Sequence, residues 1–420
     1  MPVGLIRAGR QPSNWGMGLL ANDGIGYDQS FGEKHFSLTN DRVLFATKPV
    51  AIYETIAGKD DSGFPLIAGV AVDRLVEDPL IQYYGYACRP GLEQGADDDY
   101  DPRCDIDGDG ITDADHSFDE PRLPSQRSPD WWVDQRDDVW EMVYLLAYNG
   151  EDVRYLGGTG DLFIGGYVVN RKQAESDSDV YISDFYLNSR VHGTILEFEG
   201  ISILGETRGV TLQNSVSGPD DDPLARTAAI WGYVGRAGYE QPGWRVIMEH
   251  GYASGDARVT DETFTGRSLN PDHNVGLLLY EEVIARVTSV LWTEEARGLW
   301  SNGGVYNSRY IFPTASLFPL DNWELTAGFL MAWPDQPDGA FIRCRDGDKV
   351  ECDLPTPLQA TANSLGYEVD VSLKHRWHEH MIFALEAGHA HATDRLPLDV
   401  VGLNANGNFF TVQSRIGWEF

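Results

Sequence analysis

The amino-acid sequence predicts an all-β protein, namely a transmembrane antiparallel β-barrel with long extracellular loops. Three features predict this class: strands with one apolar and one polar face, short turns that alternate with long connections, and a last strand rich in aromatic residues. The 420 residues include 45 Gly, 19 Tyr, 17 Phe and 12 Trp, which suits many short strands joined by turns. No stretch reaches the roughly 20 consecutive apolar residues that a membrane-spanning helix requires.

The alternation of apolar and polar residues is clearest in the last predicted strand, 408–420. One face of this strand carries Phe410, Val412, Ser414, Ile416, Trp418 and Phe420. The other face carries Thr411, Gln413, Arg415, Gly417 and Glu419. The strands predicted at 323–334, 364–377 and 380–393 show a similar division. In a transmembrane barrel the apolar face contacts lipid and the polar face lines the lumen.

Connection lengths separate a barrel from a soluble sandwich. Short links alternate with long ones, the short ones at 240–242, 318–322 and 378–380 and the long ones at 256–302, 335–363 and 394–407. Short periplasmic turns that alternate with long extracellular loops are typical of outer-membrane barrels. Counting back on this parity predicts about 14 strands, near 2–10, 41–48, 50–58, 138–148, 160–171, 180–192, 195–207, 226–239, 243–255, 303–316, 323–334, 364–377, 380–393 and 408–420. The segment 281–299 has apolar residues at helical spacing, which fits a short helix or a further strand.

The whole chain, 1–420, is predicted to be a single barrel domain. Its first residues, MPVGLIRAGRQ, lack the apolar core of a signal peptide, although the other features indicate export. We therefore expect a signal peptide and N-terminal strands upstream of this sequence. The complete barrel is expected to have roughly 16 to 18 strands and to lie in the bacterial outer membrane.

Charged residues of both signs fall on the polar face of the predicted strands. The candidate lumen-lining residues are Asp184, Arg190, Glu197, Glu199, Arg236, Arg245, Glu249, Arg309, Glu368, Asp370, Lys374, Arg376, Glu386 and Arg415. They indicate either a hydrated passage whose charge selects a solute or a lumen packed with salt bridges. The pattern is compatible with both interpretations.

Residues 59–137 are predicted to form one acidic extracellular insertion, rich in Asp, Pro and Gly. Within it lie the candidate calcium ligands Asp105, Asp107, Asp109 and Asp113. Alternating carboxylates followed by Gly110 match the first half of an EF-type calcium loop, although His116 stands where that loop has its bidentate Glu. The segment also resembles the calcium-binding Asp repeats of thrombospondin type 3 domains. A structural calcium ion is therefore expected, and a solvated acidic loop without an ion is the alternative.

The four cysteines lie as two close pairs in loop-like sequence. They predict the disulfides Cys88–Cys104 and Cys344–Cys352, formed in an oxidising compartment. Zinc is disfavoured because no pair has the short CxxC spacing of a zinc site.

The formal charge of −33 excludes nucleic acid as a partner, because phosphates would be repelled. An acidic surface suits partners bridged by divalent cations, such as lipopolysaccharide, and it also serves plain solubility; both interpretations stay open. The other expected partners are outer-membrane lipid and the barrel-assembly machinery, since the C-terminal Phe420 resembles the signal which that machinery reads.

No catalytic motif of the GxSxG, HExxH or phosphate-loop kind occurs in a supporting context, so the protein is predicted not to be an enzyme. An enzymatic site on the barrel rim is the alternative. The histidines at 375, 378, 380, 389 and 391 lie near Glu379 or Glu386, but short His runs at a strand end and turn are more typical of interface or turn residues than of ligands.

Several motifs resemble one known group of proteins. GLIRAGRQPSNWGMG (4–18) is similar to the GRQ strand and turn of alginate-export-type outer-membrane porins, and EHGYASGD (249–256) is similar to their glutamate strand. The segments 303–333 and 365–375 continue the likeness, which extends over nearly the whole chain. Within this group the chain is most similar to an uncharacterised outer-membrane family of myxobacteria and their relatives. The resemblance implies a large barrel, and in the alginate exporters a cationic lumen conducts a polyanion.

The predicted function is a porin-like channel for the passive passage of a solute or a polysaccharide. The alternative is a surface structural or binding protein with a closed lumen that acts through its calcium-stapled extracellular loop. A continuous lumen favours the channel, and a plug formed by 59–137 favours the alternative.

Overall fold

A computed structural model gives the structure of the protein. It describes residues 4–24, 30–32, 39–60, 62–75, 139–173, 178–207, 226–257, 263–290, 301, 303–336, 361–377, 381–399 and 402–418.

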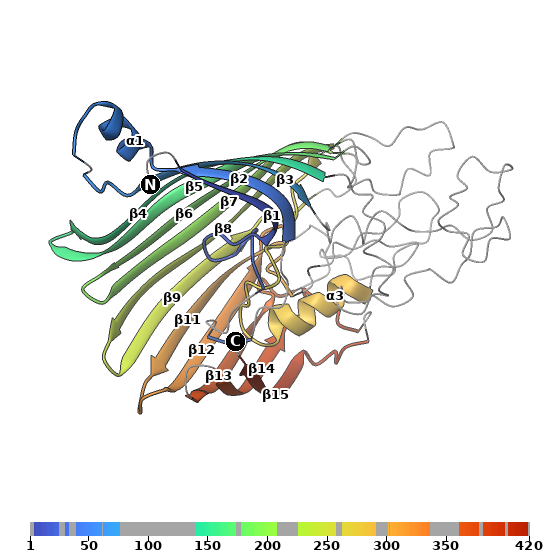
Figure 1. Cartoon of the computed structure of the whole chain (residues 1–420). Helices are drawn as coiled ribbons and strands as arrows, with labels where there is room; N and C mark the ends of the chain where they lie inside the picture. The colour runs from blue at the N-terminus through green and yellow to red at the C-terminus, as the bar shows by residue number, and fades with distance from the viewer. Residues whose placement is uncertain are drawn as a thin grey trace, which may run out of the picture.

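The described residues form one sheet of 15 strands (Figure 1). Each strand of the main path pairs antiparallel with the next: β1 (Leu5–Pro12), β2 (Thr39–Thr47), β3 (Leu66–Leu75), β4 (Val139–Tyr155), β5 (Gly158–Gln173), β6 (Ser178–Val191), β7 (Thr194–Thr207), β8 (Arg226–Gln241), β9 (Trp244–Ala253), β11 (Ser308–Leu317), β12 (Trp323–Pro334), β13 (Gly366–Trp377), β14 (Met381–Ala392) and β15 (Asn408–Trp418). The short strand β10 (Thr263–Phe264) pairs in parallel with β8. Figure 1 shows the sheet curving around an interior. In the part of the chain that is described, β1 and β15 are the two edge strands.

The two faces of the sheet differ as the alternation of residues predicts. Phe329, Val371 and Trp418 are 40%, 44% and 58% exposed on the outer face, whereas Glu386 and Thr326 on the inner face are 1% and 2% exposed. A sheet that exposes its apolar face and buries polar residues is suited to a lipid environment outside and a polar interior. The prediction of an all-β antiparallel barrel fold is confirmed.

Tight hairpins join several strand pairs at one end of the sheet, called here the turn end, and the longer connection with α1 joins β2 to β3 at the same end. In the β6–β7 turn, His192 and Gly193 have φ values of 52° and 79°, and in the β4–β5 turn Leu156 and Gly157 have 49° and 80°. Two consecutive residues with positive φ are typical of a type I′ turn, which matches the right-handed twist of the strands. The opposite end, where longer connections leave the sheet, is called the loop end.

Two chain segments lie inside the curved sheet at its loop end, and together we call them the plug. The first segment, 13–24, follows β1, and the second, 265–290, follows β10 and includes a π-helical turn η4 (Leu279–Ile284) and the helix α3 (Ala285–Val290). Apolar plug residues pack against apolar residues of the wall. Fully or almost fully buried examples are Leu19, Leu269, Leu279, Tyr280 and Ile284 from the plug and Val234, Tyr310, Leu330 and Ala332 from the wall.

Two features of the structure correct the sequence prediction. Of residues 50–58, predicted as a strand, 50–56 belong to the helix α1 (Pro49–Ile56), and 57–58 form the turn that follows it. Proline stands at the first helical position, where its fixed φ favours a helix, and the following residues lack a two-residue alternation. Residues 66–75, placed by the prediction inside the acidic insertion, form β3, so the predicted boundary of that insertion is wrong. Its remainder, 76–137, lies outside the described residues.

The segment 281–299, whose apolar spacing fits either a helix or a strand, is helical as far as residue 290. Residues 291–299 lie outside the described residues. None of the described helices combines the length and the apolar character needed to cross a membrane.

Candidate functional site: the interior of the sheet

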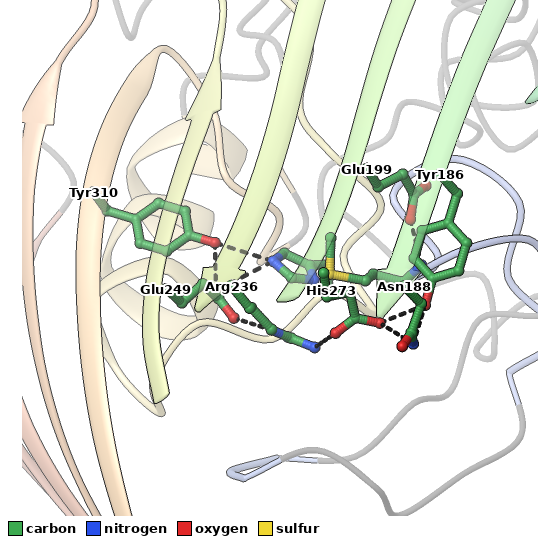
Figure 2. Close-up of polar contacts among 9 residues, drawn as sticks. Tyr186, Asn188, Glu199, Arg236, Glu249, His273 and Tyr310 are labelled. Atoms are coloured by element: carbon green, nitrogen blue, oxygen red, sulfur yellow. Dashed lines mark hydrogen bonds and ion pairs between the residues drawn. The ribbon is translucent and has the colours of Figure 1, made fainter. Parts of the chain in front are cut away.

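The centre of the interior is an ion pair between neighbouring strands (Figure 2). Arg236 of β8 donates from Nε to Oε2 of Glu249 of β9 at 2.5 Å, and its Nη1 lies 3.4 Å from Oε2 of Glu197 of β7. The hydroxyl of Tyr310 donates to the other oxygen of Glu249 at 2.6 Å. His273 of the plug lies 3.0 Å from that hydroxyl through Nε2. Wall and plug therefore share one polar network around Glu249.

The network continues toward β6. The hydroxyl of Tyr186 donates to Oε1 of Glu197 at 2.5 Å, and the side-chain amide of Asn188 donates to the Tyr186 hydroxyl at 2.9 Å. Figure 2 shows these groups in a row across the inner face, from Tyr310 to Asn188. The row connects four adjacent strands of the main path, β6, β7, β8 and β9, with β11 beyond them.

A carboxylate of β7 binds the first plug segment. Glu199 is fully buried and accepts hydrogen bonds from the backbone N–H groups of Met17 and Leu19, the second at 3.1 Å. The intervening chain adopts φ values of 57° at Gly16 and 82° at Gly18. A side chain at Gly16 would collide with the Glu199 carboxylate, so this contact requires glycine there.

A carboxylate of β13 binds the second plug segment in the same manner. Glu368 is fully buried and accepts hydrogen bonds from three consecutive backbone N–H groups, those of Leu277, Leu278 and Leu279, at 2.6, 2.8 and 2.7 Å. These amides begin the helical turn η4, whose first N–H groups have no partner within the helix. The positive end of the helix dipole also favours a carboxylate at this position.

The second plug segment carries an acid of its own, Glu281. Its Oε1 is buried without a hydrogen-bond partner, and burial together with the negative charges of Glu282 and Asp272 raises the pKa of Glu281 well above its ordinary value. The loop end of the interior therefore holds a third acid at the plug, beside Glu199 and Glu368.

The turn end of the inner face is polar and less enclosed. Arg245 of β9 donates to Glu324 of β12 at 2.6 Å, and their side chains are 26% and 28% exposed. Arg415 of β15 donates to Glu386 of β14 at 2.5 Å, and Arg415 is 17% exposed. Charges of both signs therefore meet water at this end, which no apolar plug residue covers in the described part of the chain.

The structure places the predicted lumen residues as follows. Strand register and alternation put these on the inner face: Asp184, Arg190, Glu197, Glu199, Arg236, Arg245, Glu249, Glu368, Asp370, Lys374, Arg376, Glu386 and Arg415. Arg309 lies on the outer face, contrary to the prediction, opposite Tyr252 and Trp333. The reason is Asn307, whose φ of 42° interrupts the alternation just before β11, so that Asn307 and Ser308 are both buried.

The predicted calcium ligands Asp105, Asp107, Asp109 and Asp113 lie outside the described residues, as do all four cysteines. Among the described residues, no group of three or more His, Cys, Asp or Glu side chains is arranged to hold a metal ion.

Sequence reasoning missed the plug. Met17 and Leu19 follow no strand or helix period, so nothing in their spacing marks them as buried. Two features of the sequence do point to the plug. One is the helical spacing of apolar residues after position 281, and the other is the pair of inward-facing glutamates Glu199 and Glu368. A buried carboxylate needs donors, and these two glutamates find them in plug amides.

Comparisons with known proteins find only distant structural likenesses. No protein-family model matches the chain, and no curated protein matches it in sequence. Among solved structures, outer membrane phospholipase A from Escherichia coli has 13% identity and a TM-score of 0.24, covering 69% of this chain and 88% of its own. OmpTdeltaL8, a loop L8 deletion mutant of the Vibrio cholerae outer membrane protein OmpT, has 8% identity and a TM-score of 0.30, covering 99% and 97%. The CymD monoaromatic hydrocarbon channel has 9% identity and a TM-score of 0.20, covering 85% and 70%. Likenesses this distant carry no argument about a substrate.

Proposed function

We propose that the chain forms a channel of the bacterial outer membrane for the passive passage of a polar solute, and that the plug closes its loop end in this structure. The observation that carries the proposal is the contrast between the two halves of the interior. The turn end has partly exposed charges such as Arg245 and Glu324, whereas the loop end is filled by apolar plug residues.

The way the plug is attached supports a passage that opens. Besides their apolar packing, the two plug segments are bound to the wall by side-chain carboxylates, those of Glu199 and Glu368, and by a few other polar contacts such as His273 with Tyr310. The two plug segments also bind each other, because the backbone N–H of Asn270 donates to the carbonyl of Leu19 at 2.9 Å. Their displacement would leave the antiparallel ladder of the main-path strands intact.

The resemblance to alginate-export porins suggests that an acidic polysaccharide be tested beside small ions. On this proposal the outer face binds membrane lipid and lipopolysaccharide, the barrel-assembly machinery inserts the chain, and no catalytic step is involved. The proposal also includes a structural calcium ion and two disulfides, which would stabilise the predicted extracellular segments.

Single-channel recording in planar bilayers tests the function. We expect brief openings of the unmodified protein, with weak ion selectivity because both signs of charge line the turn end. The double variant Glu199→Ala with Glu368→Ala should open more often, because five backbone N–H groups lose their acceptors. Ala327→Leu, on the outer face, is the matched control and should behave as the unmodified protein. Silence of all three proteins would reject the channel and favour the closed-lumen surface protein.

A further inference from the structure

The carboxylate that holds the first plug segment has a second acid beside it. Asp184 of β6 is 3% exposed and stands two residues from Tyr186, the register partner of Glu199, so both acids lie on the inner face against the first plug segment. The Oδ1 of Asp184 accepts a hydrogen bond from the indole N–H of Trp15 at 3.1 Å, the hydroxyl of Tyr167 is a neighbouring donor, and the buried Oδ2 makes no hydrogen bond of ordinary geometry. Two ionised carboxyl groups are both acceptors and cannot hydrogen-bond to each other, so only a shared proton can join them.

The same arrangement recurs at the second plug segment. Asp370 stands two residues after Glu368 on β13, and both residues are fully buried. Both side chains lie on the inner face of β13, and neither oxygen of Asp370 has a hydrogen-bond partner. Each plug segment is thus held by a pair of carboxyl groups in which one member binds plug amides and the other has an oxygen that makes no hydrogen bond of ordinary geometry.

Among the described residues, no cation contacts a carboxyl group of either pair directly. Besides the plug amides and Trp15, the titratable groups around the first pair are Tyr167, Tyr186, Glu141 and Glu197, and those around the second pair are Tyr280, Glu281 and Glu386. The cations nearest to the first pair are already bound, Arg171 by Glu141 and Arg236 by Glu197 and Glu249. Glu386 is itself bound by Arg415. A second negative charge in either pair would therefore be buried without a cation, which is strongly unfavourable.

A third buried glutamate of the interior, Glu249, has beside it the positive charge that the two pairs lack. Glu249 has Arg236 at 2.5 Å and accepts a further hydrogen bond from Tyr310. It needs no proton to remain buried. The two carboxyl pairs differ from it in this respect, although all three sites contact the plug.

We propose that each carboxyl pair retains one proton and that these two protons keep the plug docked. When a pair loses its proton to hydroxide in the lumen, two adjacent buried carboxylates repel each other, and hydration of the pair displaces the plug segment. The plug is then a strap that opens at alkaline pH. This inference rests on the proposed channel function and names its regulation.

Hydrogen exchange followed by mass spectrometry on the full chain in lipid nanodiscs tests the strap. Peptides that cover 13–24 and 277–290 should exchange faster at alkaline pH, after correction for the base catalysis of exchange. Each lost proton should raise the opening equilibrium roughly tenfold per pH unit. A pH-independent opening equilibrium in the unmodified protein would overturn the proposal.

Substitutions test the two pairs separately. In Asp184→Asn the side-chain amide donates permanently to Glu199, so the pH dependence of 13–24 should disappear while that of 277–290 remains. Asp370→Asn should do the reverse. Glu199→Gln removes the second charge of the same pair and should also abolish the pH dependence of hydrogen exchange in 13–24. This variant tests the first pair if Asp184→Asn does not fold. The matched control is Asp161→Asn, an exposed inner-face residue of β5. If hydrogen exchange of the plug depends on pH in all three pair variants as it does in the unmodified protein, the two protons do not keep the plug docked.

Bilayer recordings of the same proteins separate this inference from the channel itself. Alkaline exposure of the plug without any conductance would support the strap and reject the channel. Conductance that does not change with pH, together with pH-independent exchange, would support the channel and reject the strap.

Discussion

The carboxylate of Glu199 accepts a hydrogen bond from the backbone N–H of Leu19 at 3.1 Å, although the two residues are 180 positions apart in the chain. This contact fixes a segment that follows the first strand against the middle of the wall.

Arginine at Phe329 tests which face contacts lipid. Phe329 lies on the outer face of β12, and Phe329→Arg should lower the free energy of unfolding by about 2–4 kcal/mol if it is near the membrane midplane. Thr411→Arg, on the partly exposed inner face of β15, should be tolerated. Equilibrium unfolding in lipid vesicles measures both, and equal losses would contradict the assignment of faces.

Loss of Arg236 tests the central ion pair. Arg236→Met leaves Glu249 buried without its cation, because Glu249 is only 5% exposed. Breaking such a pair should destabilise the protein by about 3–5 kcal/mol. Adding Glu249→Gln to Arg236→Met should recover part of this loss, because it removes the uncompensated charge. Denaturant titration should therefore rank the unmodified protein above the double variant and the double variant above Arg236→Met. An Arg236→Met protein as stable as the unmodified one would contradict this order.

A cavity in the plug should loosen the plug more than the wall. Leu279 is fully buried, and Leu279→Ala should cost about 2–5 kcal/mol in the stability of the docked plug. Hydrogen exchange of 277–290 should accelerate, while the amides of β7 stay protected. Leu320→Ala, at a residue 67% exposed in the β11–β12 turn, is the control and should change neither.

Asp394 gives the loop end an acid-sensitive contact. It accepts hydrogen bonds from the backbone N–H and the hydroxyl of Thr361 at 2.8 and 2.6 Å and from the backbone N–H of Ala362 at 2.9 Å. These bonds, first those of Thr361, lower the pKa of Asp394 below its ordinary value. A lowered pKa means that the contact stabilises the loop above the ordinary carboxyl pKa and is lost as pH falls through the lowered value.

Exchange of the amide protons of 361–364 measured against pH checks this expectation. Protection should decrease on acidification, and Asp394→Asn should remove the pH dependence. Asp399→Asn in the same connection should retain it. A pH response that survives in Asp394→Asn would assign it to another group.

The wall could be predicted from the sequence because its signal is local. Phe410, Val412, Ile416 and Trp418 alternate with polar residues in one strand, and the structure exposes all four. The helix at 49–56 was predicted as a strand because the run PVAIYETI is largely apolar. The run has no period of two, and a proline at its first position is typical of a helix start, so both features indicate the helix.

The interior could be predicted only in part because its contacts are not local. Glu199 and Glu368 were recognised as inward-facing, but their partners are backbone amides of Leu19 and Leu277, which no side-chain pattern marks. Arg309 was assigned to the wrong face because one left-handed residue, Asn307, shifts the alternation. Single-residue backbone geometry of this kind depends on tertiary packing.

The long sequence separation of the plug contacts has a consequence for assembly. Leu19 meets Glu199 across 180 residues, and Leu279 meets Glu368 across 89. Neither segment can dock until the wall strand that carries its carboxylate has been paired, so docking is a late event in folding. On the proposed channel function, a newly inserted wall would be open for the interval before the strap closes, and a burst of permeability should accompany the protein's own biogenesis.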